Sequence, residues 1–180
     1  MVIKKYYNEI IKTDFINRYY YLKFKEIPKL EKIILNFGCK NSNFYSISAA
    51  SLFLELISQK KSIVTKSKRS NILFKIKKGN LVGCMVILRK DLMYQFLHRL
   101  VVYIFPNFKD FEGIRVLKKN LFKKKFCFTI RNFSCFKELD KQFYLFPELP
   151  YLNITLISNS RTKKEMLYLL QSLKLPLVVI

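Results

Sequence analysis

The sequence predicts an α+β fold: a mostly antiparallel sheet with helices on one face and a protruding basic β-hairpin loop. Its 180 residues are 51% apolar and 16% aromatic, which suffices for the packed core of one domain. Segments of helical period alternate along the chain with shorter runs of strand period. The chain has only four glycines and five prolines, so turns are few and the elements are long. Helices on one face would leave the other sheet face open to a ligand.

The first third of the chain predicts a helix, a strand and a second helix. Apolar residues of the segment 3–20 recur at helical spacing on one broad stripe: Ile3, Tyr6, Tyr7, Ile10, Ile11 and Phe15. Pro28 interrupts, and "KIILNFG" (Lys32 to Gly38) is typical of a strand ended by glycine. "SISAASLFLELIS" predicts the second helix, with Ser46 or Ser48 available as its N-cap.

The middle of the chain predicts the hairpin. In "NILFKIK" (residues 71–77), Ile72, Phe74 and Ile76 point to one side, which predicts a strand anchored by these three side chains. "KGNLVG" follows as a loop bracketed by glycines, and "CMVILR" returns as a second strand. The pair predicts a hairpin with a basic tip.

The last half predicts two further helices with strands between them. Asp91 is expected to cap a helix that Pro106 ends. Its apolar side is formed by Leu92, Met93, Phe96, Leu97, Leu100, Val101 and Ile104. "KKNLFKKKFCFTIRNF" predicts a basic loop entering a strand, and "LNITLIS" predicts another strand. Thr162 and Glu165 form a capping box for the last helix, which ends before Pro176.

The charge balance is strongly one-sided. The chain carries 34 basic and 12 acidic residues, a formal net charge of +22. Self-repulsion on that scale destabilises a compact chain unless a polyanion, usually nucleic acid, neutralises it. The stretch from Thr65 to Lys90 contains no acidic residue but many apolar ones, so its charge lies on folded structure. Lysines neutralise phosphates and exposed aromatic rings stack on unpaired bases, so these features predict a module that binds RNA or DNA.

Other function classes find little support. The sequence has no glycine-rich phosphate loop, and its single histidine, His98, has no candidate catalytic partner, so no enzyme is predicted, including one acting on RNA. Cys39, Cys84, Cys127 and Cys135 lack the spacing of a zinc site, so no metal or cofactor is expected. No apolar run has the length of a membrane-spanning helix. The N-terminal segment makes a poor transit peptide, which predicts that the protein works where it is made.

Three blocks of the chain resemble one family in order and spacing. They are "IPKLEKIILNFG", "SQKKSIVTKSKRSNILFKIKKGNLVGCMVILR" and "FPNFKDFEGI", with similar ends in "YYNEII" and "LNITLISNSRTKKE". These blocks resemble large-subunit ribosomal protein L5, the family that binds 5S rRNA. The resemblance implies a single ribosomal-protein domain over residues 1–180. Its parts would be an N-terminal helix (1–25), a core (26–115 and 150–180) and a divergent segment (116–150).

The resemblance also implies partners. Family members bind 5S rRNA and large-subunit rRNA in the central protuberance of the large ribosomal subunit. They reach the peptidyl-site tRNA with the hairpin loop, and they meet a small-subunit head protein at an intersubunit bridge and neighbouring central-protuberance proteins. No membrane partner is implied.

Individual positions match family residues with these roles. Three match contacts to 5S rRNA: Asn36, Gln59 and Arg89. Four match the basic rRNA-binding segment before the hairpin: Thr65, Lys66, Lys68 and Arg69. Five match the tRNA-facing loop: Lys75, Lys77, Lys78, Gly79 and Asn80. Amide side chains both donate and accept hydrogen bonds, which suits RNA base edges and 2′-hydroxyls.

The chain departs from the family pattern in one strand. Where the family has a Lys and a Thr ahead of its Arg, this chain has Met85 and Ile87, which alternation places on the same side as Arg89. If the source has lost 5S rRNA, the same surface is expected to contact large-subunit rRNA or proteins.

Composition favours an organelle-encoded protein. Lys, Ile, Asn, Phe and Tyr, whose codons are rich in A and T, are abundant, whereas Gly is scarce. The expected location is the mitochondrial matrix, in the large subunit of the mitochondrial ribosome, with a plastid or a bacterial cytoplasm as the alternative. The alternative function is a free regulatory RNA- or DNA-binding module outside the ribosome.

Overall fold

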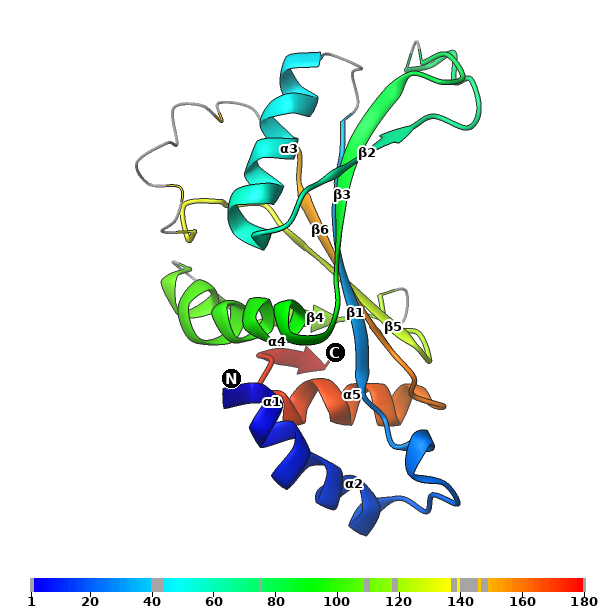
Figure 1. Cartoon of the computed structure of the whole chain (residues 1–180), viewed down its shortest axis with the longest axis vertical. Helices are drawn as coiled ribbons and strands as arrows, with labels where there is room; N and C mark the ends of the chain where they lie inside the picture. Colours follow the sequence, from blue (N-terminus) through cyan, green and yellow to red (C-terminus); the bar gives the residue numbers. More distant parts are fainter. Residues whose placement is uncertain are drawn as a thin grey trace. The chain divides into compact units, whose positions relative to one another are not determined.

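The computed structural model describes residues 2–39, 44–74, 76–108, 111–117, 120–136, 139, 146 and 149–179. The predicted α+β class is confirmed. Five strands form an antiparallel sheet in the order β2-β3-β1-β6-β5, and β4 and β7 form a second, parallel pair (Figure 1).

Helices and strands alternate irregularly along the chain. The helices are α1 Val2–Tyr6, a π-helical turn Tyr7–Ile11, α2 Lys12–Arg18, α3 Phe44–Ser58, α4 Lys90–Arg99, a second π-helical turn Leu100–Ile104 and α5 Lys163–Ser172. Short 3-10 turns occupy Phe24–Glu26 and Phe105–Asn107. The strands are β1 Leu30–Gly38, β2 Ile63–Lys66, β3 Leu81–Leu88, β4 Ile114–Val116, β5 Lys125–Ile130, β6 Leu152–Ser158 and β7 Leu177–Val179.

The chain divides into two compact units. Unit 1 comprises residues 1–33, 88–128 and 155–180, and unit 2 comprises residues 34–87 and 129–154. Unit 1 contains α1, α2, α4 and α5, and aromatic pairs join its helices. Tyr7 lies 6.4 Å from Tyr94 of α4, and Phe15 meets Tyr168 of α5 edge to face at 5.0 Å. These contacts help to bury Tyr7 and Phe15, whereas Ile10 of the expected stripe stays exposed.

The core of unit 2 is built on one phenylalanine of α3. The Phe53 ring lies 5.4 Å from Phe37 of β1 and 5.0 Å from Phe133, each edge to face. Phe136 and Phe146 approach the same ring at 5.7 and 5.6 Å. Such edge-to-face pairs add to the hydrophobic gain of burial. Helix α3 therefore covers the face of β1 that carries Phe37.

The hairpin exists, but the strand predicted over residues 71–77 is wrong. The first hairpin strand is β2, and residues 72–74 form a turn inside a long loop (Figure 1). Ile72 and Leu73 are 93% and 91% exposed, so they are not buried against the residues that the structure describes. The loop closes earlier, because Ser67 N donates to Asn80 O at 2.8 Å and Gly79 N donates to Ser67 O at 2.9 Å. The alternation of apolar residues there does not mark a buried strand face.

Helix starts differ in detail from the sequence expectations. Helix α3 begins at Phe44, before both serines proposed as its cap. Helix α4 has Arg89 as its N-cap, and Asp91 lies in the first turn, where Lys4 Nζ donates to its carboxylate at 2.7 Å. One half of the predicted capping box of α5 is confirmed, since Glu165 N donates to Thr162 Oγ1 at 3.2 Å, whereas the Glu165 carboxylate accepts from Arg161 N and not from Thr162 N.

The pairing of β4 with β7 was not predicted, because runs of three residues are too short to show a period. Among the described residues, every helix is too short or too polar to cross a lipid bilayer.

Candidate nucleic-acid interface

Strand β1 presents Asn36 on the sheet face opposite α3. Leu35 and Phe37 are fully buried, and Phe37 packs on Phe53 of α3. Because side chains alternate along a strand, Asn36 points the other way, where it is half-buried. We call this the open face of unit 2.

Strands β2 and β3 extend the open face. Ile63 pairs with Met85, and Thr65 pairs with Gly83, so each pair shares one face of the antiparallel ladder. Met85 is half-buried, whereas the alternate residue Cys84 is fully buried. The open face therefore combines the hydroxyl of Thr65 with the apolar side chains of Ile63 and Met85.

The C-terminal end of α3 brings Gln59 beside this strand pair. Gln59 ends the helix in a left-handed conformation with a φ of 54°, and its side chain is exposed. The next residue ties the helix end to β3, since Lys60 Nζ donates to Ile87 O at 2.7 Å. Glu55 accepts from the backbone N and the hydroxyl of Ser62 at 2.9 and 3.1 Å. These hydrogen bonds lower the pKa of the Glu55 carboxyl, so the carboxylate is held within the fold.

The hairpin loop carries a set of exposed cations. They are Lys66, Lys68, Arg69, Lys77 and Lys78. Within the part of the chain that the structure describes, these side chains form no ion pair. Gly79 has a φ of +91°, which a side chain would disfavour, and it turns the loop back into β3. Lys75 lies outside the described residues.

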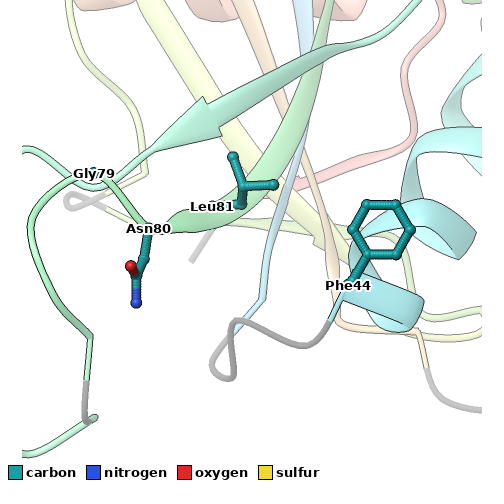
Figure 2. A pocket seen from close by; sticks show the side chains of 4 residues that line it. All are labelled: Phe44, Gly79, Asn80 and Leu81. Atoms are coloured by element: carbon teal, nitrogen blue, oxygen red, sulfur yellow. The ribbon is translucent and has the colours of Figure 1, made fainter.

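A hollow of about 350 Å³ lies beside the return of the loop into β3. Figure 2 shows its lining: Phe44 from the start of α3, and Gly79, Asn80 and Leu81 from the loop end and β3. The lining residues that the structure describes include an aromatic ring, an aliphatic side chain and an amide. This composition suits contact with a base or a side chain.

Arg89 belongs to unit 1, unlike the other proposed contacts that the structure describes. It is exposed and stands in an extended conformation at the N-cap of α4. The structure thus groups Asn36, Gln59, residues 65–69 and residues 77–80 in unit 2, and it places Arg89 in unit 1.

Comparison with known proteins identifies the family. A family model for the C-terminus of the ribosomal L5 family matches residues 81–177. The chain is 37% identical over 177 residues to large ribosomal subunit protein uL5m of Reclinomonas americana, a match that covers 97% of each chain. The chain belongs to the ribosomal L5 family. It is also 33% identical over 180 residues to uL5c of Euglena gracilis and 34% identical over 174 residues to uL5 of Nitrosomonas europaea. These matches cover 97% and 96% of the chain, and the same shares of the two relatives.

The L5 resemblance drawn from the sequence is therefore confirmed over nearly the whole chain. The match to the family model begins at Leu81, the first residue of β3, and ends at Leu177 in β7. It includes Arg89, whereas Asn36, Gln59 and the hairpin loop lie within the longer matches to whole relatives.

Sequence reasoning missed two polar side chains of this L5-family chain. Thr129 of β5 donates to the Asn153 carboxamide of β6 at 3.0 Å, and both side chains are exposed. Both alternate with buried residues, such as Phe128 and Ile154, so they lie opposite the buried face. The alternation within "KFCFTI" and "LNITLIS" could have revealed them. Beyond them, the Arg131 guanidinium lies 5.2 Å from the Tyr151 ring centre.

The four cysteines do not form disulfides with one another. Burial raises the pKa of the Cys84 thiol to about 12, so that thiol stays protonated. The His98 ring lies 6.0 Å from the Tyr103 ring. Among the described residues, no three His, Cys, Asp or Glu side chains come together as a metal site would require.

Proposed function

We propose that this L5-family chain is a structural component of the large ribosomal subunit that binds ribosomal RNA through unit 2. The observation that carries the proposal is the match to uL5 proteins along 97% of the chain. The net charge of +22 supports it, because RNA phosphates would offset the self-repulsion of the free chain. The family is a structural one, so we assign no reaction to the chain.

The open face of unit 2, together with Gln59 at the end of α3, is the proposed rRNA contact. Asn36, Gln59 and Thr65 offer amide and hydroxyl groups that can bond base edges and 2′-hydroxyls. Lys66, outward on β2, offers charge for a phosphate. Met85 brings apolar surface to the same face, and it suits the ribose or base faces of RNA better than its phosphates. The RNA is 5S rRNA where the source retains it, and otherwise large-subunit rRNA.

The hairpin loop is the proposed contact with peptidyl-site tRNA. Lys77 and Lys78 are exposed cations close to the sharp turn at Gly79, and Asn80 follows with an amide. Fixed cations at a loop end suit the phosphate backbone of a ligand that enters and leaves, because each contact contributes modestly and depends on salt. Lys68 and Arg69, on the other limb, are proposed to bind rRNA.

Other features of the proposal follow from family membership. The chain would lie in the central protuberance, touch its neighbouring proteins and bridge to a small-subunit head protein.

We propose that residues 1–180 act as one domain, since β1, β5 and β6 each contribute residues to both units. The match to the mitochondrial protein uL5m supports a place in the large subunit of the mitochondrial ribosome, in the matrix; the match to uL5c keeps a plastid as the alternative.

The test is to isolate ribosomes from the source, separate their subunits and identify the proteins of each by mass spectrometry. The chain is expected in the large subunit in an amount equal to that of other large-subunit proteins. Its absence there, with a mainly free pool in the extract, would overturn the proposal.

A comparison of RNA binding with DNA binding distinguishes this proposal from a free regulatory module. A regulatory module predicts binding to duplex DNA at least as tight as binding to structured RNA. The ribosomal role predicts preference for 5S rRNA or a large-subunit rRNA fragment over duplex DNA of equal length at the same salt concentration.

A further inference from the structure

We propose that unit 1 carries a second RNA-binding surface, where buried hydrogen bonds join three lysine-bearing segments. The segments are the approach to β1, the turn before β5 and the start of α5, which come together in the lower right of Figure 1. The exposed lysines of this lysine shelf are Lys25, Lys29, Lys123, Lys124, Lys163 and Lys164. The shelf lies outside the open face and the hairpin loop, so it goes beyond the function proposed above.

Two buried serines hold the turn before β5. Ser158 N donates to Lys124 O at 2.8 Å, and Ser160 Oγ donates to Lys123 O at 2.5 Å. The hydroxyls of Ser158 and Ser160 bond each other at 2.7 Å, and the two residues are only 1% and 0% exposed. Because buried hydroxyls are costly unless they are satisfied, this network favours a single geometry of the turn. The side chains of Lys123 and Lys124 therefore leave the protein from a fixed backbone.

Asn159, in the loop that leads into α5, holds that loop against the approach to β1. Its carboxamide oxygen accepts from Lys29 N at 2.6 Å, and its Nδ2 donates to Lys25 O and Ile27 O at 3.2 Å. Its backbone N also donates to Lys29 O at 3.2 Å. One side chain thus fixes the backbone at both lysines, and the same loop leads directly into α5.

The acidic groups of the shelf are engaged within the protein. Glu26 pairs with Arg161 and accepts from Lys23 N at 3.2 Å. Glu165 is 6% exposed and accepts from Arg161 N at 2.7 Å. In the described parts of the chain, none of the six shelf lysines forms an ion pair. Their charge is available to a partner.

The chemistry of the shelf favours RNA as that partner. Several cations that extend from a fixed backbone suit the regular charge of a phosphate backbone. Phe122, in the same turn, is 42% exposed, and Lys125 Nζ lies 4.5 Å from its ring centre, so a ring and a cation stand together. That combination serves base stacking with phosphate neutralisation. An acidic protein surface could pair with the lysines but would not need the exposed ring. It is the alternative partner that the test must distinguish from RNA.

The test compares two full-length variants that lose the same charge. Lys123→Gln/Lys124→Gln removes two shelf cations, while Lys5→Gln/Lys174→Gln removes two exposed cations elsewhere in unit 1. Each is titrated with a fluorescein-labelled RNA duplex of mixed sequence at several KCl concentrations. We expect the salt slope of the shelf variant to fall by about one to two units and that of the control to stay near wild type. Equal slopes for the two variants would overturn the proposal.

Crosslinking in isolated large subunits identifies the natural partner. A photoreactive residue at position 124 is expected to crosslink to rRNA; crosslinks to protein alone would overturn the assignment of RNA. The duplex titration does not depend on the ribosomal role. If the chain were absent from ribosomes but the shelf slope fell, only the function proposed above would fail. If the chain were present and the slope unchanged, only the shelf would fail.

Discussion

At residue 83 the backbones of β3 and β1 approach so closely that only glycine fits. A Cβ on Gly83 would lie 2.2 Å from the Phe37 carbonyl oxygen, which belongs to a strand that cannot give way easily. A Cβ added to Gly38, at the end of β1, would have no other atom within 4 Å. Gly83 is therefore required by the close packing of the two strands, whereas Gly38 is at a position with room for a side chain.

We expect Gly83→Ala to lower the free energy of unfolding by about 1–3 kcal/mol, the usual cost of overpacking. Gly38→Ala is the matched control and should stay close to wild type, because its added methyl group meets open space. Urea unfolding followed by far-UV circular dichroism measures both. A Gly83→Ala protein as stable as Gly38→Ala would contradict the close approach of the two strands.

Glu55 is expected to make the stability of the protein depend on pH. Hydrogen bonds from the backbone and the hydroxyl of Ser62 lower its pKa in the folded state. A group whose folded pKa is depressed stabilises the fold above its unfolded pKa and loses that contribution as the pH falls through the folded value. We therefore expect wild type to lose more stability than Glu55→Gln as the pH falls below 4.5, the ordinary pKa of a glutamate side chain. Parallel stability curves for the two proteins between pH 7 and the acid range would rule out this role.

The elements that the sequence predicted well are those with caps or long periods. Residues 163–172 form α5 because Thr162 caps it, and "LNITLIS" forms β6 because its alternation matches a buried strand. The segment 71–77 shows the same alternation, but Asn71 and Ile76 pair with each other in an isolated bridge inside the loop, and Ile72 and Leu73 stay exposed. Periodicity states which residues could share a face, whereas strand pairing decides whether that face is covered.

The cap of α5 is testable on its own. Thr162→Ala removes the oxygen that accepts from Glu165 N, so stability should fall by about 0.5–2 kcal/mol. Thr162→Ser keeps the oxygen and should retain most of the stability. Thermal unfolding of the two variants measures the difference; equal losses would mean that the hydroxyl does not support the helix.

The assignment of the hairpin loop to tRNA can be tested through the salt dependence of binding. Lys77→Ala/Lys78→Ala should lower the salt slope of tRNA binding to assembled ribosomes by about one to two units, because two phosphate contacts would be lost. Binding of the free chain to 5S rRNA should keep its slope, since we assign that contact to the open face and not to the loop. An unchanged slope in both assays would refute the assignment of the loop to tRNA.

For the whole molecule, charge is the dominant physical property. The chain has a net charge of +22, so its basic side chains repel one another in the free protein. At 0.1 M salt this repulsion is largely screened beyond roughly 10 Å. The melting temperature of the free protein should therefore rise with KCl concentration and rise further with a stoichiometric amount of structured RNA. A melting temperature that falls or stays constant with salt would show that the charges are already compensated within the fold.

Composition and resemblance led to the proposed partner class and to the residues assigned to the open face, but not to the lysine shelf. Lys25, Lys124 and Lys163 are far apart in the sequence and ordinary as single residues. They come together only through Asn159 and the buried serines, whose hydrogen bonds reach more than 30 residues along the chain. Contacts of that range depend on the order of strands in the sheet, which no local pattern encodes.

Strand β2 lies at the edge of the five-stranded sheet and leaves Ile63 and Val64 exposed. An edge strand with exposed apolar side chains can pair with another copy of itself, so the free protein is expected to aggregate readily. If the proposed rRNA binding holds, supply of this protein should be matched to supply of rRNA, and surplus copies should be short-lived. A cell that makes the chain without rRNA would then be expected to accumulate it as aggregates or to degrade it.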